Sequence, residues 1–241
     1  MNTLASIITT AYNFPFYIKV LISFLGGLIP VLIWLWFWEH EDKHPEPKKL
    51  ILYAFLAGML AVVAALVLEE QTANISPNFV IVLIVWVVIE ELLKFLAAYL
   101  AVLSRAENDE PIDSMMYMIT VALGFAALEN ALFLFRPIYT NSNLEALATG
   151  NMRFVGATLL HTMTSGIIGL ALALTFYRSR RARYVYVTLG VITAIVLHAF
   201  FNLSIIVFND SWPLIPFYGV WIVIILLLLA FEKVKSLTPP K

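Results

Sequence analysis

The sequence contains no cysteine and few charged residues, and both shortages restrict what the protein can be. Without cysteine there are no disulfides, no thiol nucleophile and no thiolate metal ligands. Charged residues make up 13% of the 241 and hydrophobic residues 61%, whereas a soluble domain has about 25% and 45–50%. No basic stretch interleaved with aromatic residues suggests a nucleic acid as partner. The surplus of apolar side chains must therefore face a lipid bilayer.

Long apolar segments are what the sequence has in quantity. Each of them approaches or exceeds the roughly 20 residues that cross a hydrocarbon core about 30 Å thick. The seven segments cover residues 18–38, 50–68, 79–103, 112–135, 155–177, 184–207 and 213–231. The connectors are too short to mark a second domain, and the N-terminus lacks the basic start of a cleavable signal peptide. We predict an all-α, polytopic transmembrane bundle of about seven spans, with residues 1–241 forming one membrane domain.

The distribution of basic residues orients this predicted bundle. Of the 15 lysines and arginines, Lys94 lies within a span. With the N-terminus outside, the internal side holds Lys43, Lys48, Lys49, Arg105, Arg178, Arg180, Arg181, Arg183, Lys233, Lys235 and Lys241. The external side holds only Lys19, Arg136 and Arg153. Because basic residues favour the cytoplasmic side, we expect a multi-pass protein of the cell membrane whose C-terminus is cytoplasmic.

Four of the predicted spans carry polar groups that a bilayer normally excludes. These residues are Glu90, Glu91, Lys94, Glu129, Asn130, His161, His198 and Asn202. An ionised group at mid-span costs roughly 2.5–3.5 kcal/mol, so the three glutamates and the lysine together approach about 10 kcal/mol before any pairing. At 1.5 Å per residue, the carboxylates, imidazoles and Asn202 lie roughly 8–17 Å from the external end of their spans. This shared depth predicts one water-filled chamber open to the outside.

The spacing of these residues refines the predicted chemistry. Lys94 follows Glu90 by four positions and Glu91 by three, so a helix brings its ammonium near both carboxylates. One carboxylate is then free to act as a general base. His198 and Asn202 are also four positions apart and point to one face. Carboxylates and imidazoles in a wet chamber are what an enzyme needs to activate water.

Each polar group also has a structural interpretation. The Glu–Lys pair at 90–94 fits an ion pair that holds the helix in place, Glu129 and Asn130 fit hydrogen bonds between helices, and a lone membrane histidine fits packing. If all of these residues are structural, the protein is a non-enzymatic membrane scaffold. The main alternative is a proton-coupled transporter or channel that uses the same buried residues. The shared depth and the absence of broken helices favour an enzyme.

The segment from His40 to His44 matches the H-E-x-x-H pattern of zinc proteases. That pattern needs a helix that continues through both histidines, and Pro45 and Pro47 disfavour one. We do not expect a metal there.

The motifs in combination resemble the PrsW family of intramembrane proteases. They are Glu-Glu-x-x-Lys at 90–94, Gly-Phe-Ala-Ala-Leu-Glu-Asn at 124–130, His161 followed by Thr-Met-Thr-Ser-Gly, and His-x-x-x-Asn at 198–202. The loop at 42–47 resembles the family's Glu-Pro-rich entry to its second span, with His44 in place of one glutamate. The core motifs span residues 40–205, and their order is similar to that of the CAAX-processing proteases.

The resemblance implies cleavage of a membrane-anchored protein, such as an anti-sigma factor, near the outer face of the membrane. Two mechanisms remain open. In the glutamate version, Glu90 or Glu91 activates water, Lys94 orients the pair, and His198 with Asn202 stabilises the oxyanion, while Glu129 and His161 position substrate or relay a proton.

In the metal version, His161, His198 and Glu129 hold zinc, and the Glu90–Glu91 pair supplies the base. An oxyanion role suits Asn202 better than zinc ligation does. The sequence therefore favours the metal-free version slightly.

Overall fold

A computed structural model describes residues 14–42, 44–208 and 214–239. The described chain is helical, which confirms the predicted all-α polytopic bundle. The long helices are α2 (Phe16–Glu41), α3 (Lys48–Thr72), α4 (Phe79–Ala98), α5 (Pro111–Tyr139), α7 (Thr158–Leu174), α8 (Arg180–Phe208) and α9 (Ile215–Val234). The shorter pieces are α6 (Asn143–Met152) and the π-helical segments η2 (Tyr99–Leu103) and η3 (Arg153–Ala157). Three predicted features lie outside the described ranges. They are the basic residues Lys43 and Lys241, and residue 213, the first residue of the predicted span 213–231.

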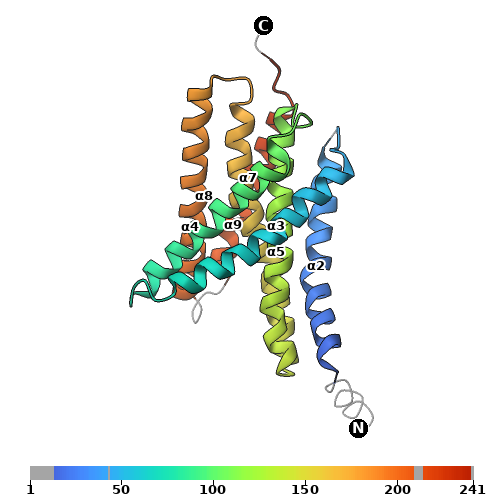
Figure 1. The fold of residues 1–241 in the computed structure, drawn as a ribbon, viewed down its shortest axis with the longest axis vertical. Coiled ribbons are helices and arrows are strands. Elements are labelled where there is room, and N and C mark those ends of the chain that lie inside the picture. Colours follow the sequence, from blue (N-terminus) through green and yellow to red (C-terminus); the bar gives the residue numbers. More distant parts are fainter. Residues whose placement is uncertain (1–13, 43, 209–213, 240–241) are drawn as a thin grey trace.

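Six helices of the described ranges are long and apolar enough to cross a membrane, with α6, η3 and α7 counted together as Leu144–Leu174. Helix α4 has 20 residues and a sequence as apolar as theirs, but it carries Glu90, Glu91 and Lys94. Successive long helices run in opposite directions, so that the start of α2 and the end of α9 lie at opposite ends of the bundle (Figure 1). The protein is a multi-pass membrane protein.

The connectors define two ends of the bundle. Residues 44–47, 104–110 and 175–179 lie together at one end, here called the basic end because it carries the Arg178–Arg183 cluster (Figure 1). Connectors 73–78 and 140–142 lie at the other, here called the cavity end. The strongest basic cluster of the sequence thus lies at one end of the folded bundle, and the cavity opens toward the other end.

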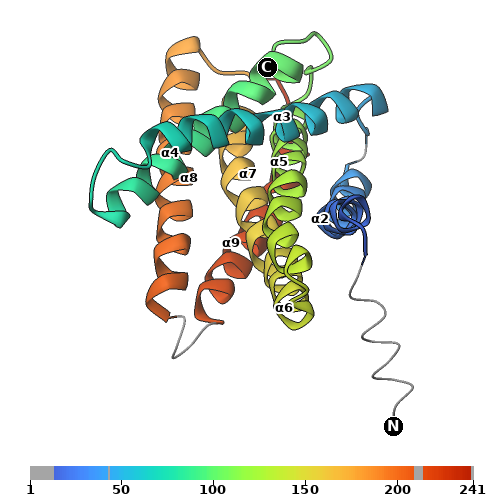
Figure 2. The same ribbon diagram turned by 60° about the horizontal axis from the view of Figure 1, so that its bottom comes forward.

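Helices α3 and α4 slant across one side of the bundle at a steep angle to α5 and α8 (Figure 2). The slant requires a close crossing between α3 and α5. Cβ atoms placed on Gly58 and Gly124 would collide with the backbone carbonyls of Val121 and Phe55 respectively. Small residues let helix backbones approach this closely in a membrane, and the crossing lies two turns from Glu129.

Helix α5 forms the centre of the structure and packs against α2, α3 and α7. Its residues from Pro111 to Ala127 are all buried, including Met115, Met116 and Met118. The side chain of Asp113 accepts hydrogen bonds from the backbone N–H groups of Asp109 and Glu110 at 2.9 and 2.7 Å. These bonds satisfy donors at the start of the helix.

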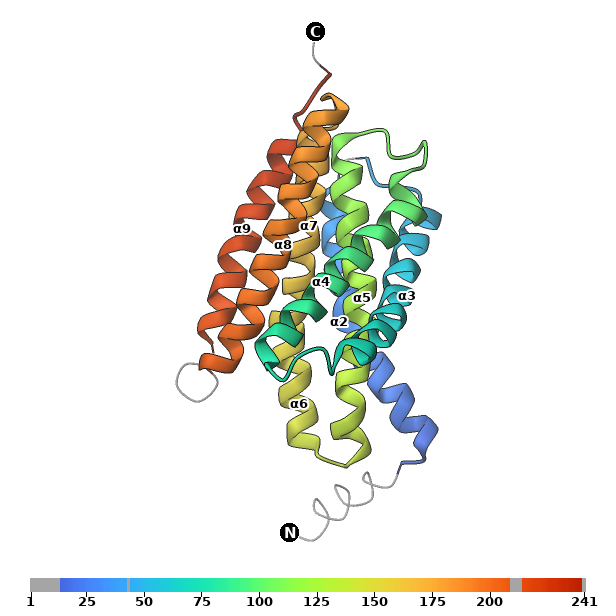
Figure 3. The same cartoon turned by 60° about the vertical axis from the view of Figure 1, so that its left-hand side comes forward.

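The sequence predicts a loop over residues 137–153, and here the structure differs. Helix α5 continues through Pro137 to Tyr139, because a proline near a helix end removes only one backbone hydrogen bond. Only residues 140–142 turn, with Asn141 at a φ of 60°. Helix α6 then leads through η3 into α7 as one continuous path beside the end of α5 (Figure 3). Helix α6 therefore occupies most of the expected loop, and η3 follows it and ends one turn before His161.

Candidate active site

A cavity of about 510 Å³ lies between α3, α4, α5, α7 and α8. Five of the eight predicted site residues line it: Glu90, Glu129, His161, His198 and Asn202. Its wall runs from Glu90 at mid-helix to Phe79 and Ile206 near the cavity end. The structure thus brings together polar residues from four helices, as their common depth predicts.

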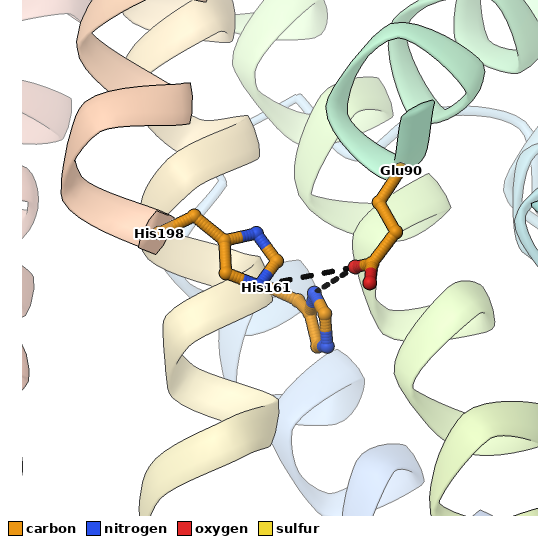
Figure 4. A group of neighbouring side chains, drawn as sticks. All are labelled: Glu90, His161 and His198. Atoms are coloured by element: carbon orange, nitrogen blue, oxygen red, sulfur yellow. Dashed lines mark ion pairs between the residues drawn. The ribbon is translucent and has the colours of Figure 1, made fainter. Parts of the chain in front are cut away.

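Three of these side chains point toward one another at the inner end of the cavity (Figure 4). The Oε2 atom of Glu90 lies 4.0 Å from Nδ1 of His161 and 3.8 Å from Nε2 of His198. The three side chains come from α4, α7 and α8 respectively. One ligand atom from each residue lies within 4.8 Å of the others, which is the spacing of a group that can share one metal ion.

Behind His198 lies a fully buried carboxylate. Oε1 of Glu91 is 2.7 Å from Nδ1 of His198, 2.5 Å from Nζ of Lys94 and 3.0 Å from Oγ1 of Thr164. Because a carboxylate accepts, the Nδ1 atom of His198 must be the donor. The lone pair of His198 is therefore on Nε2, the atom that faces Glu90.

Behind His161 lies a second carboxylate, on α5. Oε2 of Glu129 is 2.9 Å from Nε2 of His161 and is also ion-paired with Arg153. By the same reasoning Nε2 of His161 donates, and its lone pair is on Nδ1. Nδ1 accepts a hydrogen bond from Nζ of Lys94 at 3.1 Å and lies 4.0 Å from Oε2 of Glu90. Each imidazole is thus fixed in one tautomer by a carboxylate on its far side.

Asn130 and Asn202 occupy different positions. Asn130 does not line the cavity; it donates to Oγ1 of Thr158 at 2.9 Å and accepts from Nε of Arg153 at 2.5 Å. Asn202 lines the cavity one turn beyond His198. Glu91 and Lys94 lie behind the cavity wall, and both side chains are 0% exposed. The predicted residues therefore divide into those that face the cavity and those that support them.

The donor set fits a catalytic metal. Two neutral imidazoles and one carboxylate are the protein ligands of a common type of zinc hydrolase site. Oε2 of Glu90 is buried and has no hydrogen-bond partner, and a buried polar atom without a partner is costly. A metal ion between Glu90, His161 and His198 would satisfy it.

This trio differs from the one expected from the sequence. The sequence predicts Glu129 as the carboxylate ligand. In the structure its Oε2 atom accepts a hydrogen bond from His161 and forms an ion pair with Arg153. Glu90 of α4 instead lies at the shared point, 4.0 Å and 3.8 Å from the two histidines. Glu91 in turn is too deeply engaged, through Lys94 and Thr164, to face the cavity.

Sequence reasoning missed Arg153 and Thr164 as parts of the site. The sequence analysis counts Arg153 as one of three external basic residues. Because Arg153 falls in a predicted loop, the sequence does not indicate where its side chain points. Its side chain is 14% exposed and reaches both Glu129 and Asn130. The signal was present: Arg153 stands eight positions before His161, about two helical turns away.

The two histidines of the His40–His44 segment contact different groups. His40 lies in the last turn of α2, with Nδ1 2.7 Å from the carbonyl oxygen of Trp36. The ring of His44 instead lies 3.3 Å from Oε2 of Glu110. The helix ends at Glu41, as the following prolines predict.

Comparison with known proteins identifies a family whose match covers most of the chain. Residues 46–230 match the model of the PrsW family intramembrane metalloprotease. Protease PrsW of Clostridioides difficile (strain 630) is 26% identical over 200 residues, which cover 80% of this chain and 82% of that protein. Protease PrsW of Bacillus subtilis (strain 168) is 24% identical over 198 residues, covering 80% and 87%.

Protease PrsW of Geobacillus kaustophilus (strain HTA426) is 28% identical over 186 residues, covering 73% and 76% of the two chains. No solved structure matches the chain. The family match includes every residue of the cavity described above, and these relatives are named as proteases. The chain belongs to the PrsW family of intramembrane metalloproteases and is a peptidase.

Proposed function

We propose that this protein is an intramembrane endopeptidase in which Glu90, His161 and His198 hold a zinc ion. Its substrate is a membrane-anchored protein, and cleavage takes place near the outer face of the membrane. All the residues that carry the activity lie in one membrane-embedded domain.

The arrangement of acceptors supports the metal most directly. The oxygen of Glu90 and the lone-pair nitrogens of His161 and His198 face one point. Three acceptors without a shared donor repel one another, and the nearby Lys94 contacts only one of them, His161. A cation at that point would be coordinated by all three acceptors, and their mutual repulsion would be offset. The carboxylates behind both histidines are the usual outer partners of metal-bound imidazoles.

Zinc in such a site lowers the pKa of its bound water to about 7 and polarises a carbonyl group. The protein's own residues supply the rest. Glu91 and Glu129 hold the two imidazoles in the ligand tautomer. Lys94 neutralises Glu91, and Arg153 neutralises Glu129. Asn202 faces the cavity, where its amide can donate to the substrate carbonyl oxygen as negative charge develops there.

A metal-free mechanism uses the same three residues differently. In that version Glu90 itself accepts the proton of the attacking water, and the histidines bind the water and the oxyanion. The sequence alone favours this version. We now favour the metal because the oxygen of Glu90 that has no hydrogen-bond partner lies 4.0 Å and 3.8 Å from the acceptor nitrogens of His161 and His198.

A transporter requires a polar path through the whole bundle. Here the cavity runs from Glu90 toward the cavity end, and on the side of the basic end the buried part of α5 includes the apolar residues Met115, Met116, Met118 and Ile119. This packing supports an enzyme.

The charge asymmetry supports an orientation with the basic end in the cytoplasm and the N-terminus outside. The cavity end then faces outward, where an anti-sigma factor with a single membrane anchor would present its outer juxtamembrane segment.

The test compares Glu90→Gln with Glu69→Gln. Both carboxylates line the cavity, but only Glu90 belongs to the trio. We expect the purified wild-type protein and Glu69→Gln to carry zinc and to cleave a co-reconstituted membrane-anchored substrate. We expect Glu90→Gln to lose both properties. Full zinc occupancy in an inactive Glu90→Gln variant would contradict the ligand role and support the metal-free version.

A further inference from the structure

A second hollow lies on the opposite side of the α4–α8 crossing from the active site. The two helices pack together where Leu83 and Val87 meet Ala199. From there α4 slants away from α8 toward the basic end (Figure 1). The widening gap forms a groove of about 810 Å³, separate from the active-site cavity and lined by η2 and Leu172 of α7 as well.

The groove has an apolar part and a basic part. Leu92 and Phe95 of α4 face Val191 and Ile192 of α8 at the inner end. At the outer end, the next turns bring polar and basic groups to the rim: Ser104, Arg180, Arg183 and Tyr184. The ion pairs of the described ranges involve neither arginine. Both arginines also lie in the first turn of α8, where the helix dipole adds positive charge.

The length of the groove matches one leaflet. From Arg180 to Ile192 the helix rises about 18 Å at 1.5 Å per residue, and half of the hydrocarbon core is about 15 Å. An apolar trough of that length with two arginines at the level of the headgroups complements a lipid with an acyl chain and a negative phosphate. Basic pockets between transmembrane helices are known to bind anionic headgroups.

We propose that this groove is a binding site for one anionic phospholipid. The phosphate contacts Arg180 and Arg183, and one acyl chain lies between α4 and α8. The inner end of the chain contacts Leu92, which directly follows Glu91. A bound lipid therefore supports the segment of α4 that carries the active-site carboxylates.

The binding test uses the full-length protein in detergent, titrated with phosphatidylglycerol and observed by native mass spectrometry. Losing two arginine contacts in Arg180→Gln/Arg183→Gln should weaken binding about thirtyfold. The matched control is Arg178→Gln/Arg181→Gln, which removes the same charge from residues that do not line the groove. The control should bind phosphatidylglycerol nearly as wild type does, and phosphatidylcholine should bind weakly to all three. Equal losses in the two double variants would show general charge attraction and overturn the proposal.

A second measurement keeps both arginines and so does not depend on the folding of the double variant. The chain has no cysteine, so Ser104→Cys introduces a single thiol at the rim of the groove. Phosphatidylglycerol should slow its reaction with a maleimide, and the thiol of Ser179→Cys, on the 175–179 connector outside the groove, should stay reactive. Equal protection by glycerol phosphate would show that no acyl chain takes part and would overturn the site as proposed.

Discussion

The buried pair between Lys94 and Glu91 offers a sharp test of how the site is supported. The Nζ–Oε1 distance is 2.5 Å, and both side chains are 0% exposed. Replacing Lys94 by Met keeps the length of the side chain but leaves the charge of Glu91 without its partner. His161 loses the contact of its Nδ1 atom with Lys94 as well.

The expected loss of stability is large for one substitution. Breaking a buried ion pair by removing one partner costs about 3–5 kcal/mol. Lys235 and Glu232 form a second pair with the same 2.5 Å distance and the same spacing of three residues, but Glu232 is 58% exposed. Lys235→Met should therefore cost no more than about 1 kcal/mol.

Reversible unfolding of the purified protein in mixed detergent micelles measures both losses. Adding Glu91→Gln to Lys94→Met removes the unpaired charge, while the amide keeps hydrogen bonds to Thr164 and His198. The double variant should recover at least about 2 kcal/mol relative to Lys94→Met alone. Two results would refute the proposed role of the pair. One is a Lys94→Met variant as stable as Lys235→Met; the other is a double variant whose loss of stability equals the sum of the losses of Lys94→Met and Glu91→Gln.

Four further predictions concern other parts of the molecule. Arg153→Gln should lower zinc affinity about tenfold to hundredfold, because Glu129 then holds His161 less firmly; Arg153→Lys should retain part of it, and a zinc titration measures both. Asn202→Ala should lower turnover about 10²–10³-fold while zinc content stays that of wild type; a parallel loss of zinc would remove Asn202 from the oxyanion role. Gly124→Ala should cost about 1–3 kcal/mol of stability, because the new methyl group meets the carbonyl of the facing helix α3; an unchanged unfolding midpoint would contradict the close crossing. Burial raises the pKa of Glu46, in the connector before α3, from 4.5 to about 8; stability should therefore fall as pH rises from about 4.5 to about 8, and Glu46→Gln should flatten that fall in unfolding curves recorded across this range.

Most of the fold could be predicted because a bilayer leaves few choices. Backbone groups must pair within helices, so apolar segments of sufficient length marked the long helices, including the one interrupted by Glu90, Glu91 and Lys94. The slant of α3 and α4 could not be predicted. It depends on the fit of Gly58 against α5, which involves residues more than 60 positions apart.

The site was predicted less completely than the fold. Depth along a helix follows from counting residues, and on that basis His161, His198 and the glutamates were expected to share a chamber. Which carboxylate faces the histidines depends on the rotation and tilt of each helix, and no periodicity reports these. For that reason Glu129 was expected at the position that Glu90 occupies. Arg153 was missed because its surroundings were taken for a loop.

The central claim is that Glu90, His161 and His198 bind a metal ion on which proteolysis depends. The most direct measurement strips the purified wild-type protein of metal, titrates zinc back, and follows cleavage of a reconstituted membrane-anchored substrate. We predict that activity disappears on stripping and returns in full at about one zinc per chain, the capacity of a single His–His–Glu site. Full activity of the metal-free protein would contradict the claim and assign Glu90 to proton transfer instead.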